Sequence, residues 1–191
     1  MKILVTGPPI SGKSGLRRYV LEKLRSLNFQ ADHYDADRFD HPRDQRDIDC
    51  VDTPDGKRRY VVIEDVHAFG VNAVAPLDSY DVILYTNPDT ITGLRCLLTR
   101  AVAWFNNGLF DFDRDRGGWR GSGTPRDWRN ILPIATIVAK VIVNRHRHLH
   151  EDELVLQRYR GHLIVVRPRF KRGELTFSCA TDLIAVQTIK D

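Results

Sequence analysis

The residue pattern with the clearest chemical consequence lies near the start of the chain. Residues 7–14 read Gly-Pro-Pro-Ile-Ser-Gly-Lys-Ser and match the pattern G-x-x-x-x-G-K-[ST]. In such a loop backbone N–H groups surround phosphate oxygens, the lysine reaches the outer phosphates, and the last hydroxyl binds Mg²⁺. The sequence therefore predicts a site for a nucleoside triphosphate and Mg²⁺. The residues predicted to form it are Gly7, Pro8, Pro9, Ile10, Ser11, Gly12, Lys13, Ser14 and Gly15.

Two aspartates could serve an acceptor on the same side of the fold. Asp35 and Asp37 follow a strand-like run, 29–35, and either carboxylate could accept the proton of an acceptor hydroxyl. Ligands of open α/β sheets bind at the carboxyl ends of the strands, so both are expected near the phosphate-binding loop. The alternative is that they cap a turn or the next helix.

Two further acids lie at the end of the strand-like run 59–64: Glu64 is its last residue and Asp65 follows directly. Glu64 or Asp65 could hold Mg²⁺ together with Ser14, as an acid after an apolar strand does in many nucleotide-binding proteins. The alternative is a hydrogen bond that only stabilises the strand end. Lys13 and Glu64 thus join Asp35 and Asp37 as candidate catalytic residues.

A glycine-rich segment, 108–124, could act as a lid. Arg114 and Arg116, with Arg120, carry permanent charges that suit phosphate, and the glycines around them would permit closure. A solvated loop in which these arginines pair with nearby aspartates is the competing interpretation. Residues 145–150, Arg-His-Arg-His-Leu-His, are interpreted as a solvated basic helix end and not as a metal site.

These residues require a framework of alternating strands and helices. Strands are expected at 2–6, 29–35, 59–64 and 80–86, and helices at 13–28, 91–107 and 125–150, the last kinked near Pro133. Further strands are expected at 161–166, 175–179 and 183–188, the first two joined by a turn. The predicted fold class is α/β, with a mainly parallel sheet flanked by helices and extra C-terminal strands. We expect a single domain over 1–191, in which 35–58 is a substrate-side loop.

Composition narrows the range of partners. The 191 residues are 42% hydrophobic and 28% charged, with a formal net charge of only +4, so nucleic acid is a less favoured partner than a nucleotide and a small acceptor. No apolar run approaches the roughly 20 residues that would span a bilayer, so no membrane is expected. Three widely spaced cysteines without a C-x-x-C pair favour reduced thiols and a cytoplasmic location.

Several motifs together resemble the P-loop NTPase superfamily, and most closely the uridine kinase and phosphoribulokinase group. After the glycine-rich loop, Phe39-Asp40-His41-Pro42 and then Val61-Val62-Ile63-Glu64 follow in that group's order, although Asp65 stands where the group has glycine. The resemblance covers about two-thirds of the chain. It implies a P-loop fold, ATP and Mg²⁺ as cofactors, and an acceptor-side aspartate after the second strand.

The expected function is an ATP·Mg²⁺-dependent transfer of the γ-phosphoryl group to a hydroxyl of a nucleoside-like or sugar-like molecule. Residues 64–67, Glu-Asp-Val-His, with Asn87 beyond the next strand, loosely resemble motor or packaging ATPases, so a hydrolytic ATPase acting on a macromolecule is the alternative. We expect a compact domain without a partner-binding arm, which favours the kinase. A nucleotide-gated assembly factor that uses the basic residues of 145–172 is a third possibility. No Asn-Lys-x-Asp guanine signature occurs, which favours ATP over GTP.

Overall fold

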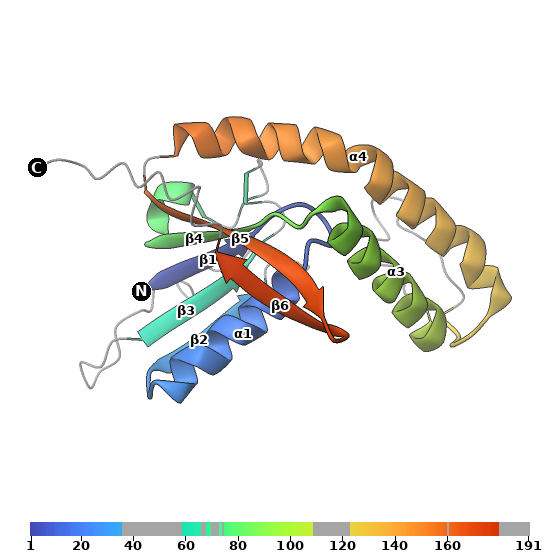
Figure 1. Ribbon diagram of the computed structural model, residues 1–191, viewed down its shortest axis with the longest axis horizontal. Helices are drawn as coiled ribbons and strands as arrows, with labels where there is room; N and C mark the ends of the chain where they lie inside the picture. The colour runs from blue at the N-terminus through green and yellow to red at the C-terminus, as the bar shows by residue number, and fades with distance from the viewer. Residues whose placement is uncertain are drawn as a thin grey trace, which may run out of the picture.

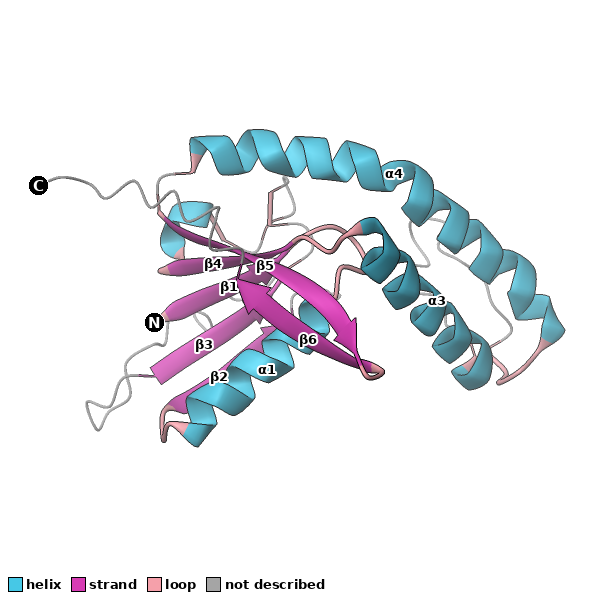
Figure 2. Ribbon diagram, in the orientation of Figure 1, coloured by secondary structure: helices cyan, strands magenta, loops and turns pink. Residues whose placement is uncertain are grey.

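The computed structural model describes residues 1–35, 59–65, 68–69, 73, 75–108, 123–159 and 161–179. These residues form a six-stranded sheet in the order β2-β3-β1-β4-β5-β6, flanked by helices (Figures 1 and 2). The first five strands in this order are parallel, and β6 runs antiparallel to β5. The strands are β1 (Lys2–Thr6), β2 (Gln30–Asp35), β3 (Arg59–Glu64), β4 (Val82–Thr86), β5 (His162–Lys171) and β6 (Glu174–Cys179). The helices are α1 (Lys13–Ser26), α3 (Thr90–Asn107) and α4 (Ile131–Arg158), with short 3₁₀ turns η2 (Leu77–Ser79) and η3 (Trp128–Asn130).

The core consists of two apolar layers, one on each face of the sheet. Successive strand residues point to opposite faces, so the continuous apolar runs of β1 and β3 supply both layers. Leu4 and Ile63 belong to one layer, together with Tyr80 and Tyr159. Val5 and Val62 belong to the other, which α1 covers through its apolar stripe. This packing fixes the first turn of α1 over the carboxyl ends of β1 and β3.

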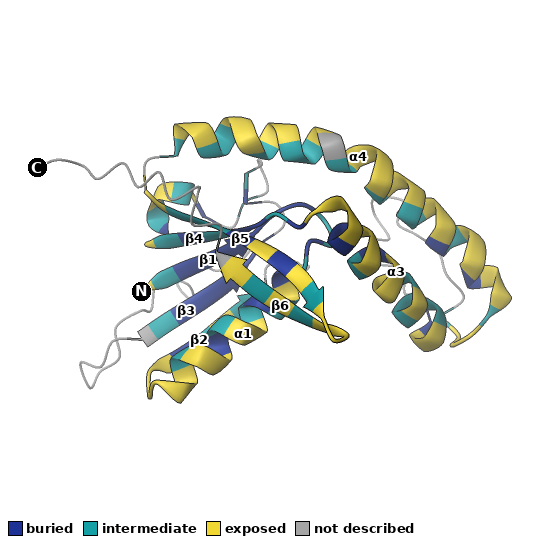
Figure 3. Cartoon of the chain, in the orientation of Figure 1, coloured by how far each residue is buried: buried dark blue, intermediate teal, exposed yellow. Residues whose placement is uncertain are grey.

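The helices α3 and α4 lie side by side and extend beyond the edge of the sheet (Figure 1). Asp89 caps α3 by accepting a hydrogen bond from the backbone N–H of Thr92 at 2.7 Å. The C-terminal part of α4 returns across the sheet, where Tyr159 packs against the core. Much of the extended part is exposed (Figure 3), and several of its exposed residues are large and apolar. They include Ile91, Leu98, Val102, Leu132 and Val143.

The sequence prediction of alternating strands and helices is confirmed for the described residues. The strands expected at 2–6 and 59–64 have those bounds. The strand expected at 161–166 begins at His162 and continues to Lys171, and a turn joins it to β6 as expected. The third long helix differs: it begins at Ile131 and continues to Arg158, so Pro133 falls in its first turn, where a missing N–H breaks no helical hydrogen bond. Residues 145–150 are therefore not a helix end, contrary to the prediction. The strand expected at 183–188 and most of the loop 35–58 lie outside the described residues.

No helix among the described residues is long and apolar enough to cross a membrane.

Candidate functional site

The loop between β1 and α1 adopts a conformation that depends on glycine. Gly12 has φ of 90° immediately before the first residue of α1. A Cβ on Gly7 would lie 2.6 Å from the carbonyl oxygen of Thr86 and still closer to the Thr86 hydroxyl. Two of the glycines that define the sequence motif are thus required by backbone geometry and by the close approach of β4.

Two hydrogen-bond systems hold this loop in place. The Lys13 ammonium is buried and donates to the carbonyl oxygens of Gly7 at 3.1 Å and Pro8 at 2.8 Å. The Thr86 hydroxyl donates to the carbonyl oxygen of Thr6 at 3.1 Å and is in short contact with the Ser11 hydroxyl, which is left to act as the donor to Thr86. The loop is therefore bonded to β4 through Thr86, and Lys13 at its end binds the carbonyl oxygens at its beginning.

The start of α1 has the properties of an anion site. Gly12 supplies no side-chain cap, and the first turn contains no acidic residue. The first N–H groups of a helix lack intrahelical acceptors and carry the positive end of the helix dipole. Phosphate oxygens would satisfy these N–H groups, so the loop fits a phosphate-bearing ligand.

Glu64 brings the second half of the site to the same helix. Strand β3 lies directly beside β1, so the end of β3 meets the first turn of α1. The Ser14 hydroxyl donates to Glu64 Oε1 at 2.7 Å, and the Arg17 guanidinium lies 3.2 Å from Glu64 Oε2. The next residue, Asp65, is completely buried, and its carbonyl oxygen accepts a hydrogen bond from Thr6 Oγ1 at 2.7 Å. Of the two acids, Glu64 is therefore the one positioned next to Ser14.

These side chains could provide part of a Mg²⁺ site. A hydroxyl and a carboxylate oxygen are ligands that Mg²⁺ accepts, and the ion commonly completes its shell with water and substrate phosphates. Within the described residues no group of three or more His, Cys, Asp or Glu side chains could hold a metal on its own. Ser14 and Glu64 thus suit an ion that arrives with a nucleotide.

The remaining predicted residues cannot all be placed. Asp35 ends β2, and its backbone is paired in register with Glu64. Asp37, Arg114 and Arg116 lie outside the described residues, as does the glycine-rich segment from 109 to 122. The predicted lid and the choice between Asp35 and Asp37 stay predictions.

Sequence reasoning missed a polar contact between α4 and β4. The Tyr85 hydroxyl donates to Asp152 Oδ2 at 2.8 Å; Tyr85 is buried and Asp152 is partly buried. Burial raises the pKa of Asp152, and the hydrogen bond from Tyr85 with the charges of His148 and Lys13 opposes the increase. Asp152 thus binds the penultimate residue of β4, and the next residue, Thr86, is the one that contacts the loop. In the sequence this contact is indicated by polar residues that interrupt the apolar stripe of α4, which resumes at Val155.

A second missed feature is the contact between the loop and the β5–β6 hairpin. A Cβ on either Gly12 or Gly15 would lie 3.1 Å from Leu175 Cδ2, and one on Gly15 would also lie 3.2 Å from Phe177 Cζ. The hairpin therefore packs directly against the start of α1. Glycine at position 15 could have indicated this close approach, but its partners are 160 residues away in the sequence.

No protein-family model and no curated protein matches the chain. Among solved structures, one similar chain is described as "Crystal structure of APE1195". The two share 11% sequence identity and a TM-score of 0.37, over 75% of this chain and 95% of that one. A similarity at this level assigns the chain to no family.

Proposed function

We propose that the chain is a P-loop phosphotransferase, which binds ATP·Mg²⁺ at Gly7 to Gly15 and transfers the γ-phosphoryl group to a hydroxyl of a small acceptor. The observation that carries the proposal is the hydrogen bond from Ser14 to Glu64, 50 residues apart in sequence. The Mg²⁺ of a bound nucleotide needs two protein groups: a hydroxyl that follows a glycine-rich loop and a carboxylate at the end of a strand.

Each residue has a defined part in this scheme. Bound Mg²⁺ would neutralise charge on the β- and γ-phosphates. Lys13 would exchange the carbonyl oxygens of Gly7 and Pro8 for phosphate oxygens, and Ser14 with Glu64 would hold the ion. Arg17 keeps the Glu64 carboxylate oriented through their ion pair. Asp35 or Asp37 would accept the proton of the acceptor hydroxyl.

The burial of Asp65 supports phosphoryl transfer over hydrolysis. A water-activating acid must reach a water molecule in line with the γ-phosphate. Asp65 occupies the position of such an acid but is completely buried. Glu64 is engaged by Ser14 and Arg17, which suits metal binding better than proton abstraction from water.

The test is ATP turnover with Mg²⁺, first alone and then with pooled nucleosides, sugars and vitamin precursors. We expect ADP release that depends on an acceptor, together with a product whose mass is increased by one phosphoryl group. Lys13→Ala should reduce turnover by about 100-fold or more, because the charge at the transferring group is lost. Lys23→Ala, at an exposed position of the same helix, is the matched control and should leave turnover unchanged. ADP release that ignores every acceptor would contradict the proposal.

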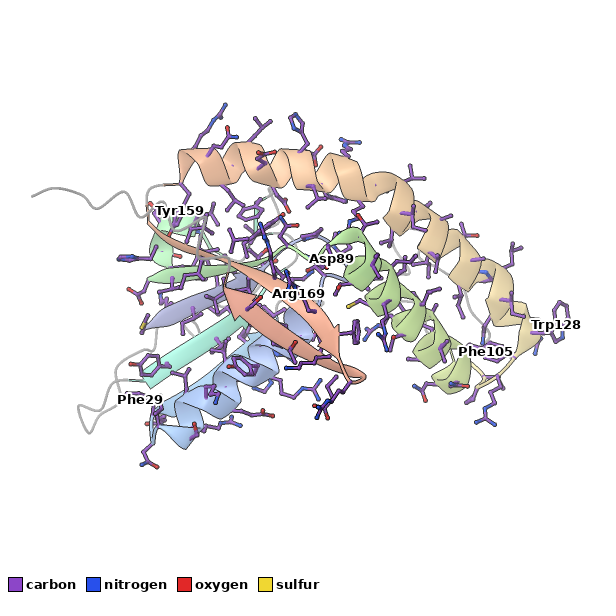
Figure 4. All side chains as sticks on the ribbon, viewed as in Figure 1. Phe29, Asp89, Phe105, Trp128, Tyr159 and Arg169 are labelled. Atoms are coloured by element: carbon purple, nitrogen blue, oxygen red, sulfur yellow. The ribbon has the colours of Figure 1, made fainter. Side chains whose placement is uncertain are left out.

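A second candidate, an ATPase that acts on a macromolecule, is supported by the helical extension. The absence of a partner-binding arm was an argument for the kinase at the sequence level, but α3 and α4 extend from the sheet with exposed apolar side chains (Figures 1 and 3). Trp128, in the 3₁₀ turn η3 that precedes α4, is 76% exposed (Figure 4). Acceptor-independent turnover combined with nucleotide-dependent oligomerisation in size-exclusion chromatography would favour this candidate.

A further inference from the structure

A row of basic side chains lies on one face of the β5–β6 hairpin. Arg167, Arg169 and Lys171 alternate along β5, so they share one side of the strand, and all three are exposed. Arg172, in the turn that follows Lys171, is also exposed. The residues opposite the first three on β6 are Ser178, Thr176 and Glu174. This face, together with the adjoining turn, therefore carries four positive charges, two hydroxyls and one carboxylate. We call it the basic hairpin face.

Protection of an open strand edge does not by itself explain the row. Edge strands often carry charged residues that prevent pairing with other chains. The basic residues lie on the part of β5 that extends beyond β4: β4 pairs with residues 162–166, and residues 167–171 pair only with β6. A charge of either sign would protect this edge, so edge protection does not explain why all of these residues are basic.

Internal ion pairing accounts for only part of the charge. Asp89, at the start of α3, lies near Arg169 (Figure 4). The pKa of Asp89 is lowered mainly by the hydrogen bond from Thr92, and the Arg169 charge adds to this effect. Glu174 is the cross-strand neighbour of Lys171. Among the described residues two carboxylates therefore lie near these four cations, which leaves a positive excess on this part of the surface.

The chemistry of the face points to phosphates in a regular series. Arginine and lysine side chains are among the groups that most often contact nucleic-acid phosphates, whereas the Thr176 and Ser178 hydroxyls already donate to the carbonyl oxygens of Arg169 and Arg167. The hairpin's aromatic residues belong to the other face: Phe177 contacts α1, and Phe170 lies under the Arg95 guanidinium at 4.4 Å. With no aromatic platform on the basic side, stacking on bases is not available there.

We infer that the basic hairpin face binds the sugar–phosphate backbone of a nucleic-acid strand, without reading its sequence. The sequence disfavoured nucleic acid because the net charge is only +4, but alternation in β5 concentrates the basic residues on one side. This inference does not depend on the proposed phosphotransfer.

The test is fluorescence anisotropy with a labelled single-stranded oligonucleotide of mixed sequence and with the corresponding duplex. Four neutralised phosphates predict that log K falls with log[salt] with a slope of about −3. The triple variant Arg167→Gln, Arg169→Gln, Lys171→Gln should bind at least tenfold more weakly. The control triple variant Arg100→Gln, Arg126→Gln, Arg158→Gln loses the same charge at exposed positions elsewhere and should bind within twofold of the unmodified chain.

Three outcomes would overturn the inference. Equal weakening by both triple variants would mean that net charge alone drives binding. Complete displacement of the oligonucleotide by stoichiometric MgATP would assign the row to the nucleotide site. Binding to phosphatidylserine vesicles as tight as to the oligonucleotide, without binding to phosphatidylcholine vesicles, would show a general anion surface. Thermal unfolding verifies that the variants fold, and if the hairpin triple does not, the double variant Lys171→Gln, Arg172→Gln at the turn should still weaken binding severalfold.

Discussion

Glu64 is the residue on which most of the candidate chemistry depends. Its two carboxylate oxygens contact Ser14 and Arg17, and the side chain is buried. Water therefore cannot compensate for the loss of its charge. Glu64→Gln keeps the shape but removes the charge. We expect the apparent Mg²⁺ affinity, measured by titrating Mg²⁺ at fixed ATP, to fall by about tenfold or more. Glu22→Gln, at an exposed position of α1, should leave it unchanged, and an equal effect of both changes would contradict the role.

Asp152 gives a prediction about stability and pH. Because burial raises its pKa above the ordinary 3.8, the folded chain binds a proton at this carboxyl that the unfolded chain has already released. Stability therefore falls as pH rises from about 4 through the raised pKa. Asp152→Asn keeps an oxygen acceptor for Tyr85 and removes the charge. The variant should have a melting temperature that depends less on pH between 4 and 7 and is no lower at pH 7. A steeper decline with pH in the variant would exclude this account.

At the scale of elements, the contact between the hairpin and α1 links the stability of the fold to ATP binding by the glycine-rich loop. Leu175 is half-buried and lies against both Gly12 and Gly15. Leu175→Ala should lower the free energy of unfolding by about 1–2 kcal/mol, less than for a fully buried leucine, and should weaken ATP binding because the loop loses its support. Thr176→Ala, on the opposite side of β6, is the control. Chemical denaturation and calorimetric ATP titration measure the two effects, and loss of stability without loss of affinity would separate the hairpin from the site.

The elements also explain which features the sequence could predict. Runs such as 2–6 and 59–64 are apolar on both faces and end at polar residues, so strand type and boundaries follow from local pattern. The motif at 7–14 and Glu64 could be found because chemistry constrains their residue types. Leu175 and Asp152 could not, because their importance comes from strand order and helix length. The end of α4 was placed too early because polar residues at 145–152 resemble a helix end when their contacts with β4 are not known.

At the scale of the whole molecule, the β5–β6 hairpin connects two surfaces. One face of this two-stranded ribbon contacts the glycine-rich loop through Leu175 and Phe177, and the other is the basic hairpin face. A nucleic-acid strand bound to the basic hairpin face would restrict the motion of the hairpin and therefore of the start of α1. Because linked binding equilibria are reciprocal, nucleic acid should change the affinity for ATP, and ATP should change the affinity for nucleic acid by the same factor.

This coupling can be measured without knowing the acceptor. ATP affinity is determined by calorimetry with and without a saturating oligonucleotide at low salt, and oligonucleotide affinity with and without ATP. We expect both to shift in the same direction by about fivefold or more, within the usual range of coupling energies. In the hairpin triple variant, ATP affinity should no longer respond to the oligonucleotide, although ATP still binds. If the oligonucleotide binds the basic face and ATP affinity does not change, the two faces of the hairpin act independently.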